Sequence, residues 1–319
     1  MVGRHHYLVH GLRLSTPTLL PIPKAGPGPV DVEYELALTT DDLPTVRHTR
    51  TDNPNDPWCF EHWVGDSAVD HVIVEFPGSA TFELSRDLVK LRRDDTDDDD
   101  LIAHLLLDHI LPRVVALRGD LMLHASGVVG PSGSAHLFLG PSGTGKSTLA
   151  TALAAAGWPL LDDDGVRVVE RGGVWCAVPG YAGVRLLPDS AAAVVPGLPK
   201  GRPMGNDHPK HRYPVDGTTL RMASGARPIG CIYLVERTDD GDEPNALRVT
   251  ALGFAESITA LTEHAFHLAD EPTAITRQAF EHAAAVAAAV PIRTLRTPTG
   301  LEAMGATIAA LRELDAALS

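Results

Sequence analysis

The pattern of hydrophobic and polar positions divides the chain into a strand-rich first third and a longer mixed part. In the first 98 residues, apolar and polar positions alternate with a period of two, most clearly over Val30–Leu38, which predicts half-buried strands. Shorter runs of the same kind occur at Tyr7–Val9, His71–Phe76 and Ala80–Leu84, and turn-forming residues separate the last two from their neighbours. Residues 1–98 therefore predict a β-rich domain.

After residue 98 the pattern changes to strongly apolar helices and to strands in hairpins. The acidic run Asp94–Asp100 marks the expected domain boundary, and Asp100 is placed to cap a helix that reaches about Leu117. Two apolar runs around the turn Gly130–Gly133 predict a β-hairpin. Further helices are predicted over residues 254–269, 273–289 and 301–318. Residues 99–319 are expected to form an α/β domain with a mixed, largely antiparallel sheet.

The hairpin leads directly into a glycine-rich segment, Gly140–Ser147, which reads GPSGTGKS. An apolar run precedes it and an alanine-rich helix is predicted over Lys146–Ala156, which is the arrangement of a phosphate-binding P-loop. Glycines allow backbone N–H groups to turn towards an anion, and the helix N-terminus adds its positive dipole end. Lys146 would then neutralise the β- and γ-phosphates, and the Ser147 hydroxyl would bind Mg²⁺. The residues predicted to hold the nucleotide here are Gly140, Pro141, Ser142, Gly143, Thr144, Gly145, Lys146, Ser147 and Thr148.

Three consecutive carboxylates, Asp162, Asp163 and Asp164, end the strand that follows this helix. Phosphoryl transfer to a hydroxyl needs a proton acceptor and a group that binds the metal, and carboxylates can serve as both. Neighbouring side chains on a strand point to opposite sides, so Asp162 could pair with Asp164 instead of Asp163. Three exposed aspartates in a turn are the alternative without a catalytic role.

Composition limits the partners of the protein. The formal net charge of −14 at pH 7 argues against nucleic acid or an acidic membrane surface, and local groups must hold an anionic nucleotide. The N-terminus carries no apolar leader, and no apolar run is long enough to span a membrane. The three cysteines lie far apart without a C-x-x-C pair, as is usual in a reducing compartment. We expect a cytoplasmic protein, and a homo-oligomer stays open.

Four features occur in order between residues 121 and 235: a strand with a histidine (LHASGVV), a hairpin, the loop LFLGPSGTGKSTLATAL, and aspartates one short helix later (GWPLLDDDGV). Together they resemble the catalytic domain of HPr kinase/phosphorylase and its relatives, which include kinases of lasso-peptide precursors. The resemblance implies a fold related to phosphoenolpyruvate carboxykinase, with ATP and Mg²⁺ as cofactors. It also implies Asp163 as general base, Asp164 as a metal ligand and His124 as an active-site residue. A hydrogen-bonded core histidine is the alternative for His124.

The expected activity is ATP-dependent, Mg²⁺-assisted phosphoryl transfer to a hydroxyl, with a serine of a peptide or protein, of the lasso-precursor type, as the acceptor. The expected catalytic residues are Asp163, His124 and Lys146. Lys210 and Arg212 are the preferred cationic clamp for the γ-phosphate or the acceptor, ahead of Arg185, Lys200 and Arg202. A small-molecule hydroxyl kinase and a non-catalytic nucleotide-binding regulator are the alternatives. The β-rich domain is expected to help to hold the acceptor.

Overall fold

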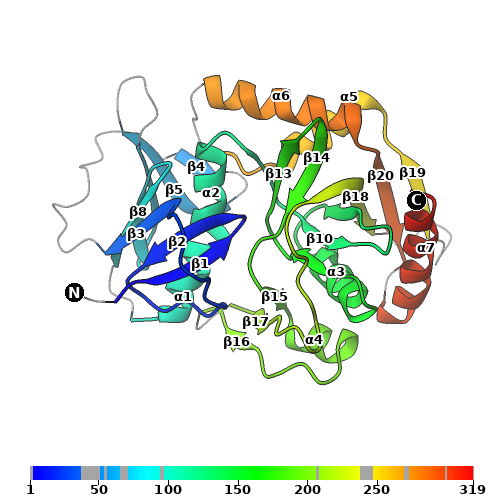
Figure 1. Ribbon diagram of the computed structural model, residues 1–319, viewed down its shortest axis with the longest axis horizontal. Coiled ribbons are helices and arrows are strands. Elements are labelled where there is room, and N and C mark those ends of the chain that lie inside the picture. The colour runs from blue at the N-terminus through cyan, green and yellow to red at the C-terminus, as the bar shows by residue number, and fades with distance from the viewer. Residues whose placement is uncertain are drawn as a thin grey trace.

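The computed structural model describes residues 3–36, 51–53, 56–64, 71–93, 97–205, 208–237, 247–268, 273–298 and 300–318. These residues form two large sheets and one small sheet, and helices cover both faces of the second large sheet (Figure 1). The fold is therefore of the mixed α/β class, as the sequence predicts.

The N-terminal part of the chain forms the first large sheet, at the left of Figure 1. Its order is β1-β2-β3-β8-β7-β6-β5-β4; β3 pairs in parallel with β2 and β8, and the other pairs are antiparallel. The strands are β1 (His5–Val9), β2 (Leu12–Thr16), β3 (Val32–Leu36), β4 (Thr51–Asn53), β5 (Asp56–Val64), β6 (His71–Phe76), β7 (Ala80–Leu84) and β8 (Leu88–Arg93). The predicted strands at the positions of β3, β6 and β7 are confirmed, although the end of the predicted β3 lies outside the described residues.

A long helical segment follows, made of α1 (Asp99–His104), a π-helical turn η2 (Leu105–Ile110) and α2 (Leu111–Leu117). The carboxylate of Asp98 accepts a hydrogen bond from the Leu101 N–H at 2.9 Å and caps the helix. The prediction that Asp100 is the cap was wrong, because the helix already begins at Asp99. The apolar side of the segment packs in one core with the first sheet, through contacts of residues such as Ile110. The division of the chain at residue 98 stays a prediction, and this helix lies on the sheet that precedes it.

The second large sheet is nine-stranded within the described residues and contains the order β12-β10-β11-β18-β14-β13-β9, with β20 beside β18 and β19 beside β20. Its strands are β9 (Leu121–Leu123), β10 (Ser126–Val129), β11 (Ala135–Leu139), β12 (Leu160–Asp162), β13 (Val166–Arg171), β14 (Val174–Val178), β18 (Arg227–Arg237), β19 (Arg248–Ala251) and β20 (Ile292–Thr297). The pairs β11–β18 and β18–β20 are parallel and the other pairs are antiparallel. The predicted mixed, largely antiparallel sheet is therefore confirmed.

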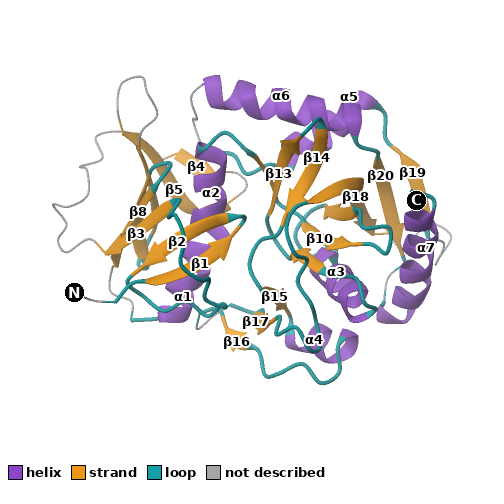
Figure 2. Cartoon of the chain, viewed as in Figure 1, coloured by secondary structure: helices purple, strands orange, loops and turns teal. Residues whose placement is uncertain are grey.

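This sheet is a middle layer between helices. Successive side chains along β11 point to opposite faces of the sheet, and helices pack on both faces. Leu137 and Leu139 pack on one side with Leu261 and Val286 of α5 (Phe254–Glu263) and α6 (Thr273–Ala289). Phe138 packs on the other side among residues of α3 and α7 (Figure 2). These and the remaining elements are α3 (Lys146–Ala155), α4 (Pro188–Val194), η3 (Leu301–Ala303) and α7 (Met304–Ala316), with the small sheet β15 (Gly183–Leu186), β17 (His211–Pro214) and β16 (Arg202–Pro203). Among the residues that can be placed, no helix has the length and apolar character needed to cross a membrane.

Candidate active site

The glycine-rich segment connects the end of β11 to the start of α3. Gly143 and Gly145 have φ angles of 85° and 96°, in the left-handed region that favours glycine. A Cβ on Gly140 would lie 2.7 Å from the carbonyl oxygen of Val235 on β18, so the loop lies tightly on the neighbouring strand. Gly145 is the N-cap of α3, no side chain caps the helix, and its first turn holds no acidic residue. The N-terminal N–H groups of α3 are thus left for an anion.

Lys146 lies at the first position of α3, and its side chain is largely buried. Its Nζ donates hydrogen bonds to the carbonyl oxygens of Gly140, at 2.5 Å, and Pro141, at 3.0 Å. Burial, followed by the nearby charge of Lys210, lowers the pKa of Lys146 to about 8. The ammonium group is thus held against the loop in the position from which it could reach a bound phosphate. Ser147, the predicted metal ligand, is half-buried in the same helical turn.

A cavity of about 240 Å³ opens beside the loop. Thr144, Gly145 and Thr148 form one wall, and Val235 of β18 lies next to them. The remaining lining residues come from α3, α4, the end of β20, the connection that follows it, η3 and the start of α7: Leu149, Ser190, Thr297, Pro298, Gly300, Leu301, Ala303, Met304 and Thr307. Because these segments are far apart in sequence, no local pattern could have predicted this cavity.

Asp162 ends β12, and its side chain binds the main chain of the turn that follows. Its Oδ1 accepts hydrogen bonds from the N–H groups of Asp163, at 2.6 Å, and Asp164, at 3.2 Å, which is an Asx-type turn. Its side chain is buried, with Oδ2 lying 3.5 Å from Nδ1 of His10, and burial raises its pKa well above the usual value. Asp162 thus shapes the turn that presents Asp163 and Asp164. Gly180 is required beside it, because a Cβ there would lie 1.3 Å from the Asp162 Oδ2.

Asp163 is buried, and two groups hold it through three contacts. Its Oδ2 accepts the main-chain N–H of Arg185 at 2.6 Å, and its Oδ1 lies 3.4 Å from the hydroxyl of Ser126. The Ser126 hydroxyl also donates to the Asp163 carbonyl oxygen at 2.5 Å. The carboxylate charge of Asp163 acts to raise the pKa of both Lys146 and Lys210, against their burial. The charge of Asp163 therefore acts on the loop lysine.

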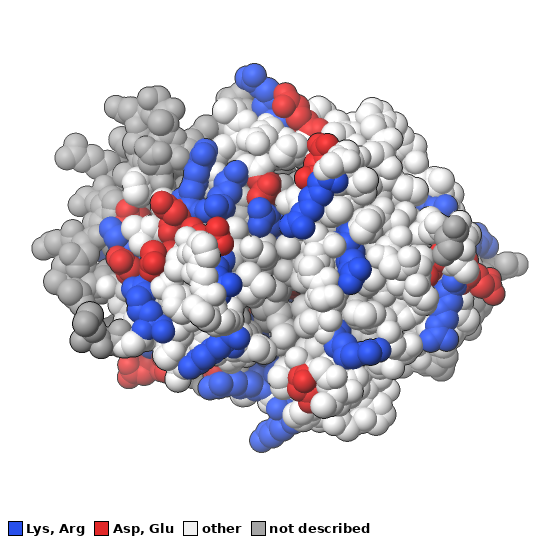
Figure 3. Space-filling model, in the orientation of Figure 1, with Lys and Arg blue, Asp and Glu red and all other residues white. Residues whose placement is uncertain are grey.

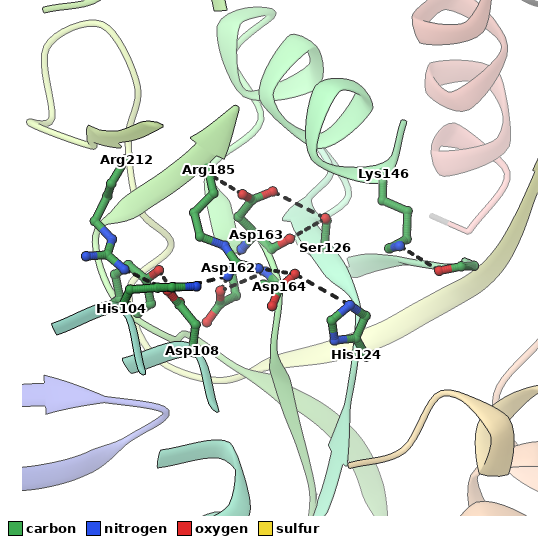
Figure 4. Close-up of polar contacts among 12 residues, drawn as sticks. His104, Asp108, His124, Ser126, Lys146, Asp162, Asp163, Asp164, Arg185 and Arg212 are labelled. Atoms are coloured by element: carbon green, nitrogen blue, oxygen red, sulfur yellow. Dashed lines mark hydrogen bonds and ion pairs between the residues drawn. The ribbon is translucent and has the colours of Figure 1, made fainter. Parts of the chain in front are cut away.

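Asp164 is more exposed than Asp163 and lies between two partners. Its Oδ1 forms an ion pair with Nη2 of Arg185 and lies 3.6 Å from Nε2 of His124. Loss of solvent around the ring, then the charges of Lys146 and Arg185, lower the pKa of His124 to about 3, so this histidine is neutral at pH 7. The side chain of His124 is still 41% exposed. Figure 4 shows Asp163 and Asp164 between Arg185 on one side and Lys146 on the other.

The two basic residues predicted as a clamp lie in different surroundings. Lys210 is half-buried, and among the described residues its ammonium group forms no ion pair or hydrogen bond, although its charge lowers the pKa of Lys146. Arg212 is buried, donates from Nη2 to Oδ2 of Asp108 at 2.6 Å, and its guanidinium lies over the ring of Tyr181. A contact between Arg212 and a nucleotide stays a prediction. Of the weaker candidates, Lys200 is exposed, Arg202 pairs with Asp100 at the surface, and Arg185 lies in the site.

Sequence reasoning missed Asp108, Ser126, Tyr181 and His10, which all contact the aspartates or their partners. For Asp108 a signal was present, because a lone carboxylate interrupts the apolar run Leu105–Leu111. A charge in such a run is costly to bury unless it is paired. The other three carried no signal, since their contacts depend on the tertiary fold.

Ser147 and Asp164 have the chemistry to hold a Mg²⁺ ion that substrate phosphates also bind. Among the described residues, no three His, Cys, Asp or Glu side chains are grouped as a metal site would need. Magnesium is commonly bound by one or two carboxylates together with substrate phosphates, and Asp164 and Ser147 provide oxygen ligands of that kind.

On the face in Figure 3, Lys and Arg side chains are spread across the middle of the molecule, which counteracts the net negative charge locally.

Comparison with known proteins gives a distant similarity of fold. The sequence matches no protein-family model and no curated protein. Among solved structures, the chain is similar to the HPr(Ser) kinase/phosphatase from Coxiella burnetii, with 11% sequence identity and a TM-score of 0.34. The match covers 60% of this chain and 88% of the other. A similarity at this level carries no argument about activity, so any function must be argued from the site.

Proposed function

We propose that the protein is an ATP-dependent kinase that transfers a phosphoryl group to a hydroxyl. The observation that carries the proposal is the uncapped, glycine-rich start of α3, with Lys146 folded onto the loop and coupled to the buried carboxylate of Asp163. Phosphate binding, charge neutralisation and a proton acceptor are the parts that phosphoryl transfer needs.

In this proposal the β- and γ-phosphates lie in the loop Gly140–Ser147, and the cavity beside the loop takes the nucleoside. Ser147 and Asp164 would hold Mg²⁺, which neutralises phosphate charge and orients the transferred group when bound. Lys146 and Lys210 would bind the γ-phosphate. These residues follow β11 and β12 or precede β17, and the charge of Lys210 acts on Lys146.

Asp163 is the proposed general base. It would accept the proton of the acceptor hydroxyl as the hydroxyl oxygen forms its bond to the γ-phosphorus and the bond to ADP breaks. Arg185 would give the two carboxylates different roles. Its guanidinium pairs with Asp164, and its main-chain N–H binds Asp163. Neutral His124 would orient Asp164 through its Nε2.

The acceptor that we propose is a serine of a peptide or protein, on the basis of the sequence resemblance to HPr kinase and to kinases of lasso-peptide precursors. The N-terminal sheet would form part of the acceptor site, because the turn between β1 and β2 reaches the aspartates through His10. The sequence also predicts two alternatives, a small hydroxyl compound as acceptor and a regulator without catalysis. A homo-oligomer and a cytoplasmic location stay predictions as well.

Binding of Mg·ATP with a matched lysine control tests the proposal. We expect Mg·ATP to raise the melting temperature of the wild type and of Lys90→Ala, since Lys90 pairs with Glu83 in the first sheet. Lys146→Ala should fold but lose most of this stabilisation. Serine-containing peptides incubated with Mg·ATP should gain the mass of one phosphoryl group with the wild type and with Lys90→Ala, but not with Lys146→Ala. Equal stabilisation of wild type and Lys146→Ala would refute the phosphate loop. ATP binding without transfer to any hydroxyl offered would favour the regulator.

A further inference from the structure

Asp108 is buried in the π-helical turn of the segment that covers the first sheet. The turn is marked by the N–H of Leu111, which donates to the carbonyl oxygen of Leu106 five residues earlier. π-helical turns are rare and occur often at functional sites. The Asp108 side chain is 1% exposed and points towards Arg185 of β15 and Arg212 of β17 (Figure 4). A carboxylate in this position needs partners, and His104 of the same segment supplies one while Tyr181, Arg185 and Arg212 supply the others.

Four groups from three parts of the chain surround the Asp108 carboxylate. Its Oδ1 accepts the hydroxyl of Tyr181 at 2.5 Å. Its Oδ2 accepts Nη2 of Arg212 at 2.6 Å, lies 2.7 Å from Nδ1 of His104, and lies 3.4 Å from Nη1 of Arg185. Burial opposes the ionised form, but Arg185 and Arg212 hold the pKa of Asp108 well below its usual range. Asp108 is therefore a buried anion that shares one of its two arginines with the proposed active site.

Arg185 connects Asp108 to both site carboxylates. Its main-chain N–H binds Asp163, one guanidinium nitrogen pairs with Asp164, and the other lies near Asp108. The single positive charge of Arg185 thus interacts with the negative charges of Asp108 and Asp164. The place is largely buried, and charge interactions there are stronger than in water. The more strongly Asp108 interacts with Arg185, the less Arg185 neutralises the negative charge of Asp164.

We propose that Asp108 is a positioning residue that keeps Asp164 available for a divalent cation by competing with it for the charge of Arg185. The proposal rests on the proposed function, in which Asp164 holds Mg²⁺. Without the Asp108 charge, Arg185 would pair with Asp164 alone and compete with the metal. Without the hydroxyl of Tyr181, Asp108 would interact more strongly with the arginines. The metal would then bind more tightly at Asp164.

Binding of Mn²⁺ in the presence of saturating ADP, followed by the electron paramagnetic resonance signal of free Mn²⁺, tests this directly. Asp108→Asn keeps the size of the side chain and should weaken Mn²⁺ binding by roughly three- to thirtyfold, the range of coupling expected for residues in one charge network. Arg185→Gln removes the guanidinium charge and keeps the main-chain bond to Asp163. In the Arg185→Gln background, Asp108→Asn should shift Mn²⁺ binding by less than about twofold, because the route to Asp164 is gone.

The comparison separates this role from a structural one. A similar shift of Mn²⁺ binding in both backgrounds would mean that Asp108 acts by its general field and would overturn the proposal, as would no shift in either. If Asp108→Asn fails to fold, Tyr181→Phe decides, since a packing role predicts weaker or unchanged Mn²⁺ binding and the proposal predicts tighter binding. If the wild type binds no Mn²⁺ with ADP, the proposed function fails together with this inference. If the wild type binds and the variants do not differ, this inference alone fails.

Discussion

His10 and Asp162 face each other across the junction of the first sheet and the second, with Nδ1 and Oδ2 3.5 Å apart and both side chains buried. His10 stands at the turn between β1 and β2 with a φ of 51°, a region that residues other than glycine rarely adopt. Its carbonyl oxygen accepts a hydrogen bond from Nη1 of Arg167 at 2.9 Å. The turn of the first sheet is therefore fixed against the strand that ends in the site aspartates.

This pair predicts a pH dependence of stability. Burial lowers the pKa of His10 from 6.5 to about 4. Between these values the unfolded chain binds a proton that the folded chain does not, so the unfolding free energy should fall as the pH drops from 6.5 to about 4. The raised pKa of Asp162 acts in the opposite direction, but Asp162 is present in the wild type and in the variant His10→Gln alike. We expect His10→Gln to remove up to about 3 kcal/mol of the acid-dependent loss, measured by urea unfolding. Equal slopes for wild type and variant would contradict this.

The arrangement of the three aspartates predicts different effects for matched substitutions. Asp163→Asn should leave Mg·ATP binding intact and lower phosphoryl transfer by roughly 10²–10⁴-fold, because the proton acceptor is lost. Asp162→Asn keeps an oxygen that can accept the two N–H groups of the turn and removes a buried acid, so transfer should change little. Single-turnover transfer measured for both variants checks the assignment. A severe loss in Asp162→Asn with a silent Asp163→Asn would move the proposed base by one residue.

Asp164 predicts a metal phenotype. Asp164→Asn should raise the Mg²⁺ concentration needed for half-maximal transfer, because it removes a charged ligand, and should leave binding of metal-free ATP unchanged. The measurement is a Mg²⁺ titration of transfer at saturating ATP, with metal-free binding by calorimetry. An unchanged Mg²⁺ midpoint would assign the metal to other groups.

The cavity beside the loop predicts where the nucleoside lies. Ala303 lines the cavity, and Ala309 is exposed further along α7. Ala303→Trp should fill the cavity and weaken ATP binding roughly tenfold or more, while binding of tripolyphosphate stays unchanged. Ala309→Trp is the control and should bind both as the wild type does. Equal loss of ATP and tripolyphosphate in Ala303→Trp would indicate a distorted loop and not a filled nucleoside site.

The parts of the fold that the sequence predicted are those set by local pattern. Alternation identified β3, β6 and β7, and the spacing of glycines with Lys146 identified the loop between β11 and α3. The partners of buried charges were beyond such reasoning, because they are fixed by contacts between residues distant in the chain. Arg212 shows this: it lies in a comparatively basic segment and was predicted to meet a phosphate, and the fold pairs it with Asp108, 104 positions earlier. Asp162 likewise differs from Asp163 through its burial against His10, which no spacing reveals.

The helical segment of residues 99–117 has a consequence for how this protein can be taken apart. Its apolar side lies in the core of the first sheet, and its opposite side carries Asp108 to the arginines beside the aspartates. A chimaera that exchanges residues 1–98 for another recognition module would leave that apolar side without its cover. An exchange after Gly119 would instead take away the carboxylate that binds Arg212. We therefore expect new acceptor specificities to arise by changes within the first sheet and not by transplanting a whole module onto residues 99–319.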